Sequence, residues 1–140
     1  MSKIKNNITI TKLKKITLKK GNVLKFIDKK DKNFFGFGEV YFSLIKKNKI
    51  KAWKKHTKMI MNLTVPIGRV KFVFFNEDRK FLKEVIVGDK DYKRITVKPG
   101  IWFGFKGLSN GVNLVSNFSN IVHESKESTN IEISEIIYKW

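Results

Sequence analysis

Hydrophobic and polar residues alternate along most of the chain with a period of two, which is the pattern of half-buried β-strands. The alternating runs are rich in β-branched and aromatic residues, which favour strands. They cover residues 8–11, 16–18, 40–42, 69–74, 84–87 and 94–97. Helical spacing of apolar residues is confined to residues 133–137. The pattern therefore predicts an all-β chain.

Turn-forming residues separate these runs at intervals of about ten residues. They lie at residues 20–22, 47–49, 66–68, 88–90, 98–100 and 109–111. Pro99 fixes its own φ and Gly100 permits a positive φ, so the chain can reverse tightly before the aromatic strand that follows. Many short strands at this spacing predict an antiparallel sandwich or jelly roll. Without a linker or repeat, we expect one domain over residues 1–140, with residues 1–20 as a variable N-terminal arm or strand.

The composition is that of a folded domain. The chain has 140 residues, of which 41% are apolar and twelve are Phe, so a disordered basic tail is excluded. Because no apolar run approaches the roughly 18 residues of a membrane span, we expect a cytoplasmic protein without a membrane partner. The absence of cysteine excludes disulfides, thiolate nucleophiles and thiolate metal sites.

The net charge of +18 is concentrated in the first half of the chain. Residues 1–60 hold eighteen Lys and three acidic residues, whereas arginine, the residue that reads base edges, occurs three times in the chain. A nucleic-acid-binding β-barrel is one interpretation of this charge. The other is a solvated surface that reflects the Lys, Ile and Asn usage of a genome poor in G and C. The scarcity of Arg favours the second, so we do not expect a nucleic-acid partner.

Four segments in order resemble the dTDP-4-dehydrorhamnose 3,5-epimerase family of cupins. They are residues 38–43 (GEVYFS), 50–56 (IKAWKKH), 65–73 (VPIGRVKFV) and 97–105 (VKPGIWFGF), and the ending at residues 132–140 is also similar. The resemblance covers roughly residues 20–140. It implies a cupin-type jelly-roll fold, a homodimer, and action on a nucleotide-linked 4-keto-6-deoxy sugar in surface polysaccharide biosynthesis.

The resemblance also implies where a site would lie. Lys51 takes the place of the arginine that binds the sugar nucleotide in this family, and Lys54 takes the place of the histidine base. The family's second histidine falls at Phe103, and its general-acid tyrosine falls near Ile121 or Val122. The catalytic set is therefore incomplete, which keeps open a catalytically silent cupin that binds a sugar or sugar nucleotide.

His56 and Lys54 are the two candidates for a general base. His56 lies two residues beyond Lys54 and so shares its strand face, and its ordinary pKa suits proton abstraction near neutral pH. Lys54 would act as a base only if burial or neighbouring lysines depress its pKa. A buried, purely structural His56 is the alternative interpretation, and His123 is expected to be an exposed loop residue.

A second resemblance, to the sugar-nucleotide 3,4-ketoisomerases, is carried by residues 39–42 and 51–58. In that alignment His56 matches the second histidine of the ketoisomerase motif and Tyr41 its first tyrosine. A Tyr41 hydroxyl that faces His56 would supply the missing acid. The catalytic prediction is therefore His56, Lys54 and Tyr41.

Further residues are expected to bind the substrate. Basic side chains can neutralise a diphosphate, and a Trp ring can stack on a sugar or base. Phe103 and Phe105, in contrast, are expected in the core. The predicted binding set is Lys51, Lys58, Arg69, Trp102 and Asn120. A cupin metal would need three or more ligands, but the chain has two His, so we expect neither a metal nor another cofactor.

Overall fold

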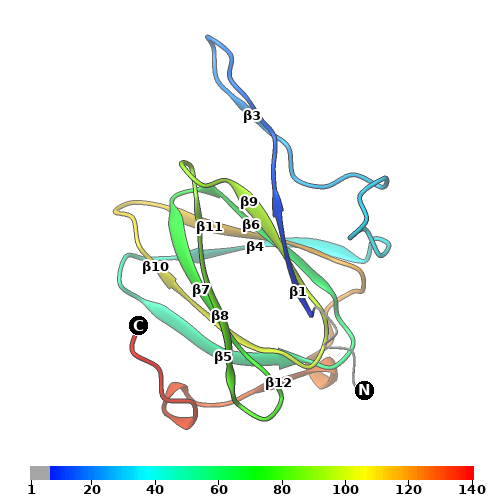
Figure 1. Cartoon of the computed structure of the whole chain (residues 1–140), viewed down its shortest axis with the longest axis vertical. Helices are drawn as coiled ribbons and strands as arrows, with labels where there is room; N and C mark the ends of the chain where they lie inside the picture. Colours follow the sequence, from blue (N-terminus) through cyan, green and yellow to red (C-terminus); the bar gives the residue numbers. More distant parts are fainter. Residues whose placement is uncertain (1–6) are drawn as a thin grey trace.

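The structure, a computed structural model, describes residues 7–140 and is built almost entirely from β-strands (Figure 1). Its strands are β1 (Ile8–Lys12), β2 (Lys15–Ile16), β3 (Val23–Leu24), β4 (Glu39–Ile45), β5 (Ile50–His56), β6 (Met61–Ile67), β7 (Arg69–Phe75), β8 (Phe81–Gly88), β9 (Lys93–Val97), β10 (Trp102–Gly107), β11 (Asn113–Ser119) and β12 (Ser128–Asn130). Two 3₁₀ turns, η1 (Ser125–Glu127) and η2 (Ile133–Glu135), lie near the end of the chain.

The six alternating runs all contribute to strands, so the all-β prediction is confirmed. The apolar spacing at residues 133–137 yields one 3₁₀ turn rather than a helix.

Two five-stranded antiparallel sheets face one another and form the sandwich. The first has the order β1-β9-β6-β11-β4, and the second has the order β12-β5-β10-β7-β8. Apart from β7 and β8, which are consecutive, neighbouring strands within a sheet come from distant parts of the sequence, as they do in a jelly roll. The jelly-roll prediction is confirmed.

Strand alternation decides which side chains fill the space between the sheets. In β4, Tyr41, Ser43 and Ile45 point inward, whereas the intervening residues are exposed. The core that the two sheets enclose contains aromatic rings from β7 and β10, among them Phe72, and aliphatic side chains from the first sheet. The phase of this alternation thus determines which residues can reach an interior cavity.

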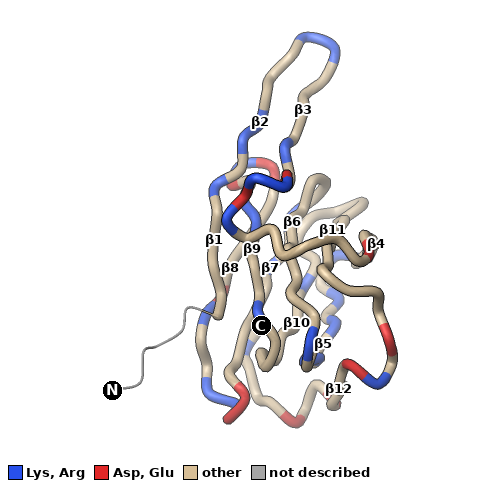
Figure 2. The backbone as a smooth tube through the Cα atoms, turned by 90° about the vertical axis from the view of Figure 1, so that its right-hand side faces the viewer, with Lys and Arg blue, Asp and Glu red and all other residues tan. Residues whose placement is uncertain are grey.

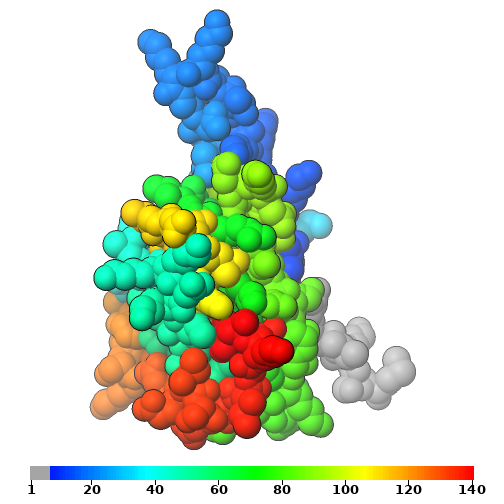
Figure 3. Space-filling view, turned by 90° about the vertical axis from the view of Figure 1, so that its left-hand side faces the viewer, coloured from blue at the N-terminus to red at the C-terminus, as the bar shows by residue number. Residues whose placement is uncertain are grey.

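A second apolar cluster lies on the outer face of the second sheet, where the C-terminal segment covers it. Its buried members are Trp53, Val73, Phe75, Trp102 and Ile136, and the ring of Trp140 packs against them. In Figure 3 this segment, coloured red, lies across the lower part of the molecule. The indole of Trp53 donates to the carbonyls of Ile133 and Ile136, each at 3.2 Å. The tail therefore extends the core beyond the two sheets.

The β2–β3 hairpin projects from one end of the sandwich (Figures 1 and 3). The segment that follows it, residues 25–38, turns back over the outer face of the first sheet, where Arg94 of β9 hydrogen-bonds the carbonyl of Phe26. Part of the expected N-terminal arm is thus strand β1, paired with β9, and residues 1–6 lie outside the described residues. In residues 7–140, no helix combines the length and the apolar character needed to cross a membrane.

Candidate active site

A bulge in β5 turns two lysines toward the space between the sheets. Phe103 of β10 pairs with Lys54, whereas the next residue, Gly104, pairs with Ala52, so Trp53 is an extra residue in β5. Because of this extra residue, Lys51 and Lys54 lie on the same face although they are three positions apart. Gly104 fits the bulge closely, since a Cβ at this position would lie 2.6 Å from the Ala52 side chain.

Lys51 and Lys54 line a cavity of about 430 Å³ between the sheets. This volume falls in the range of about 300–1,000 Å³ that is typical of small-molecule sites. The wall is largely apolar, and its polar side chains come from β4, β5, β11 and β12: Tyr41, Ser43, Lys51, Lys54, Asn117 and Asn130. No carboxylate lines this cavity in the part of the chain that the structure describes. The cavity is therefore positively charged and suited to an anionic ligand with an apolar part.

His56 lies at the end of β5 and is held by Glu127. Its ring is parallel to that of Phe103, a cavity-lining residue, with 5.9 Å between the ring centroids. Nδ1 of His56 lies 2.7 Å from Oε1 of Glu127, and the exposed fractions of the two side chains are 3% and 4%. Nε2 of His56 is buried and has no hydrogen-bond partner among residues 7–140. One ring nitrogen is thus fixed and the other is free to accept a proton.

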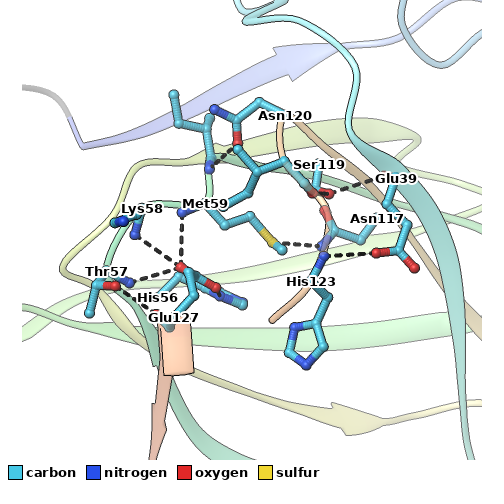
Figure 4. A network of polar contacts seen from close by, with 12 residues as sticks. Glu39, His56, Thr57, Lys58, Met59, Asn117, Ser119, Asn120, His123 and Glu127 are labelled. Carbon is cyan, nitrogen blue, oxygen red and sulfur yellow. Dashed lines mark hydrogen bonds and ion pairs between the residues drawn. The ribbon is translucent and has the colours of Figure 1, made fainter. Parts of the chain in front are cut away.

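The Glu127 carboxylate is fixed from the opposite side by backbone groups. Its Oε2 accepts hydrogen bonds from the N–H groups of Thr57, Lys58 and Met59 at 2.9–3.0 Å (Figure 4). Burial alone would raise the pKa of Glu127, but the hydrogen bonds from Met59, Lys58 and His56 outweigh burial and lower it. Glu127 is therefore a carboxylate that accepts the Nδ1–H of His56.

The pKa of His56 is also lower than its ordinary value. Burial is the largest cause, and the positive charge of Lys54 acts in the same direction. The hydrogen bond and the negative charge of Glu127 oppose both effects without cancelling them. His56 is consequently neutral near pH 7, with a free lone pair on Nε2, which is the state that a general base requires.

Tyr41 contributes a hydroxyl from the opposite sheet. The hydroxyl accepts a hydrogen bond of 2.8 Å from the side-chain amide of Asn117, which is the register partner of Tyr41 in β11. Burial raises the pKa of Tyr41, and the nearby charge of Glu127 acts in the same direction. The phenol is therefore protonated at neutral pH and is able to donate a proton. The same hydroxyl donates a hydrogen bond of 3.9 Å to the sulfur of Met59.

The structure brings four of the predicted site residues together. Tyr41, Lys51 and Lys54 line the cavity, and His56 lies directly behind Phe103. The ammonium group of Lys51 also donates to the carbonyl of Leu44, 3.0 Å away, which holds it beside β4.

The other four predicted binding residues lie away from the cavity. Trp102 points to the outer face of its sheet, because strand alternation directs its neighbour Phe103 inward, and the C-terminal segment buries it. Lys58 and Arg69 are exposed, and Lys58 reaches the site through its backbone N–H alone. The side chain of Asn120 accepts a hydrogen bond from the N–H of Ile60 and so fixes a loop.

Glu127 and Asn117 are the site residues that the sequence analysis missed. Glu127 lies in the polar segment ESKES, where a buried carboxylate has no local signal. Asn117 lies on the inward face of β11, two residues after Val115, but that strand was not identified from the sequence. His123 is exposed, as expected, and its N–H donates to the Glu39 carboxylate. No group of three potential metal ligands occurs in residues 7–140.

Comparisons with known proteins identify the fold. Neither a family model nor a curated protein matches the sequence. Among solved structures, a dTDP sugar isomerase from Desulfovibrio desulfuricans G20 is similar, with a TM-score of 0.88 and 28% sequence identity. The match covers 95% of this chain and 90% of that protein.

Two further similar structures represent different sugar-nucleotide reactions. QdtA, a sugar 3,4-ketoisomerase from Thermoanaerobacterium thermosaccharolyticum solved in complex with TDP, has a TM-score of 0.77 at 19% identity, over 95% of this chain and 96% of that one. ChmJ, a 3'-monoepimerase from Streptomyces bikiniensis solved with dTDP-quinovose, has a TM-score of 0.83 at 8% identity, over 96% and 75% of the two chains. The chain therefore has the jelly-roll cupin fold of the dTDP-sugar isomerases and epimerases, which confirms the resemblance found in its sequence.

Proposed function

We propose that the chain is an isomerase of a nucleotide-linked 4-keto-6-deoxy sugar, with His56 as its general base. The observation that carries this proposal is the buried pair of His56 and Glu127. Glu127 fixes the tautomer of the ring, so that the unpartnered Nε2 is the proton acceptor. A base held in this way, behind a cationic cavity, is suited to removing a proton from the carbon beside a ketone.

The reaction that we propose moves three protons. Nε2 of His56 takes a proton from the carbon next to the ketone, and the electron pair of the broken C–H bond moves into an enolate. The ammonium group of Lys54, which lines the same cavity, is placed to stabilise the negative charge on the enolate oxygen. For the carbonyl to migrate, the proton of the neighbouring hydroxyl moves to the former carbonyl oxygen within the enediolate. Tyr41, from the opposite sheet, then protonates the former carbonyl carbon while the neighbouring oxygen becomes the ketone, which gives the isomer. His56 and Tyr41 regain their starting protonation states by exchange with solvent.

The position of Tyr41 favours a 3,4-ketoisomerase over a 3,5-epimerase. Tyr41 corresponds to the tyrosine of the ketoisomerase pattern and lines the cavity. The place of the epimerase tyrosine falls at Ile121 or Val122, of which the first packs against the core and the second is 61% exposed. Neither side chain can donate a proton.

The lysines support a nucleotide-linked substrate. With Lys51 and Lys54 in its wall and no carboxylate among its described lining residues, the cavity complements a diphosphate. The similar structures include proteins solved with TDP and dTDP-quinovose. We retain the cytoplasm as the expected location and surface polysaccharide biosynthesis as the expected role.

We also propose a homodimer, in which the outer face of β4 is part of the interface. On this edge strand the outward side chains of Val40, Phe42 and Leu44 are 41%, 63% and 61% exposed. Three large apolar residues in a row are unusual on a free surface. Phe42→Asp is expected to shift the mass measured by light scattering from dimer to monomer, and a wild-type protein that is monomeric at micromolar concentration would refute the dimer.

Solvent deuterium incorporation tests the function. In D₂O we expect dTDP-4-keto-6-deoxyglucose to gain deuterium beside its carbonyl and to form the 3-keto isomer, as followed by NMR. His56→Asn should abolish the exchange, and the exposed His123→Asn should leave it unchanged. Deuterium at C3 or C5 without carbonyl migration would identify an epimerase instead. Saturable binding without any exchange would indicate a silent sugar-nucleotide-binding cupin.

A further inference from the structure

A second cleft, of about 380 Å³, lies at the foot of the projecting hairpin. It is formed by β1, by the end of the hairpin and by the segment that covers the outer face of the first sheet. Its lining residues are Thr11, Lys12, Leu13, Lys14, Leu24, Lys25, Phe26, Ile27, Asp28, Asp31 and Arg94. None of them lines the cavity between the sheets, so the two sites are separate.

Arg94 is a buried cation in this cleft with few close partners. The exposed fraction of its side chain is 1%. One terminal nitrogen donates to the carbonyl of Phe26 at 2.7 Å, and the other lies 3.5 Å from Oδ1 of Asp31. The second distance exceeds the roughly 2.7–2.9 Å of a charge-assisted hydrogen bond. Nε of Arg94 is buried and has no partner within the described part of the chain.

A guanidinium in this state is unfavourable unless further acceptors complete its hydrogen bonds. It carries five N–H donors, and a buried charge is costly when its partners are incomplete. The interior neighbour Ile95 belongs to the main core, so Arg94 points to the opposite face of β9, toward the cleft. The arrangement calls for an anion that supplies several oxygens.

Three exposed lysines surround the same cleft. Lys12, Lys14 and Lys25 form no ion pair with any residue from 7 to 140. Figure 2 shows the basic segments at the foot of the hairpin and along the loop that follows it. These lysines therefore add positive charge to the lining of the cleft.

Two carboxylates line the cleft as well, and both are engaged in local structure. Oδ1 of Asp28 accepts the N–H of Lys30, and Oδ2 of Asp31 accepts the N–H of Asp28, each at 2.7 Å. They hold the turn that closes one side of the cleft. Four cations against two carboxylates leave a net positive charge of two on the lining.

We propose that this cleft is a binding site for a phosphate or diphosphate group, distinct from the candidate active site. Arg94 supplies the planar donors at its base, and the lysines at the rim supply the charge that attracts a dianion. The anion belongs either to a soluble phosphate ester or to a lipid headgroup, since the chemistry of recognition is the same.

Pyrophosphate titration of the ¹⁵N-labelled protein tests the proposal. We expect saturable shifts in the backbone amides of residues 11–14 and 24–28. The variant Lys12→Gln/Lys14→Gln/Lys25→Gln should weaken this binding at least about tenfold, because it removes charge-assisted contacts. A matched variant, Lys47→Gln/Lys49→Gln/Lys83→Gln, removes three exposed lysines elsewhere and should bind as the wild type does.

Two further measurements complete the test. Arg94→Lys keeps the charge but loses the planar fork, so pyrophosphate should raise its melting temperature less than that of the wild type. If phosphatidylglycerol vesicles retain the wild-type protein but not the triple variant, the anion is a lipid headgroup. If the protein binds pyrophosphate but is not retained on the vesicles, the anion belongs to a soluble ligand.

The proposal would be overturned if pyrophosphate left the backbone amides of the cleft unshifted and the vesicles did not retain the protein. It would also be overturned if the triple lysine variant showed the same amide shifts as the wild type. Neither result would affect the proposed isomerase, because dTDP is expected to shift the amides around Lys54 and Asn117, which line a cavity that shares no lining residue with this cleft.

Discussion

Nδ1 of His56 and Oε1 of Glu127 lie 2.7 Å apart, although the two residues are separated by 71 positions in the sequence. The backbone N–H groups that follow His56 bind the second oxygen of the same carboxylate. Glu127 therefore orients the ring and anchors the end of β5 at the same time. The pair can be tested by changing the carboxylate while the imidazole is kept.

Glu127→Gln should lower kcat by about a hundredfold or more, because the amide no longer fixes the tautomer of His56. The Glu127 carboxylate raises the pKa of His56. Removal of this carboxylate should therefore also move the acid limb of the kcat/KM profile to lower pH. Steady-state rates measured from pH 5 to 8 provide both results.

The matched control for this substitution is Glu124→Gln, an exposed change in the same segment. It should leave both the rate and the pH profile unchanged. An unchanged profile in Glu127→Gln would mean that Glu127 anchors the loop without acting on His56.

Tyr41→Phe should slow the return of a proton to the substrate while the protein remains folded. The hydroxyl accepts a hydrogen bond from Asn117 and donates a weak one to the sulfur of Met59, so its loss should cost about 0.5–1.5 kcal/mol of unfolding free energy. We expect kcat to fall about a hundredfold and deuterium exchange at the substrate carbon to persist, because His56 still removes the proton. Loss of exchange together with turnover would show that Tyr41 does not act as the acid.

The unfolding free energy should decrease as the pH falls, in two stages. His56 has a folded pKa below its ordinary value of 6.5, so the unfolded chain binds the extra proton first and stability declines below about pH 6.5. Glu127 has a folded pKa below 4.5, so its contribution is complete above that pH and is lost as the pH falls through the folded value.

Urea unfolding at several pH values between about 2.5 and 7.5 measures this dependence, because the Glu127 stage lies below pH 4.5. His56→Gln should remove the first stage and leave the second. A stability that stays constant between pH 6.5 and 5 in the wild type would contradict the lowered pKa of His56.

Ile136→Ala should destabilise the protein by about 2–5 kcal/mol, because it opens a cavity between the C-terminal tail and the second sheet. Ile136 is 4% exposed, whereas its neighbour Ile137 is 92% exposed. Ile137→Ala is therefore a control expected to change stability by no more than about 0.5 kcal/mol. Equal effects in urea unfolding would show that the tail does not pack as described.

The sequence predicted the fold because alternation and turn residues are local signals. Residues 69–74 and 94–97 were identified from their alternation, and the turn at Gly100 has the positive φ that was expected. Tyr41 and His56 were found through motif order. The structure places Tyr41 in the wall of the cavity and stacks His56 on the cavity-lining ring of Phe103. The shared face of Lys54 and His56 follows from simple alternation within the last three residues of β5.

The remaining site residues depend on information that no local pattern contains. The bulge at Trp53 places Lys51 on the face of Lys54, and it becomes apparent only when β10 is paired with β5. Trp102 points to the outer face of its sheet, where the C-terminal segment, about 30 residues further along the chain, covers it. The sequence therefore could not show that this side chain is unavailable to a ligand. Glu127 acquires its role through three backbone donors from another segment.

The separation of interacting residues along the chain has a consequence for how the protein refolds. Tyr41 and Asn117 lie 76 positions apart, and most other pairs of neighbouring strands are also far apart in the sequence, with β7 and β8 as the exception. Non-local pairings of this kind incur loop-closure entropy before any contact compensates for it, and such domains fold in milliseconds to seconds. Catalytic competence should accordingly return together with complete sheet assembly, and no partially ordered intermediate should carry a fraction of it.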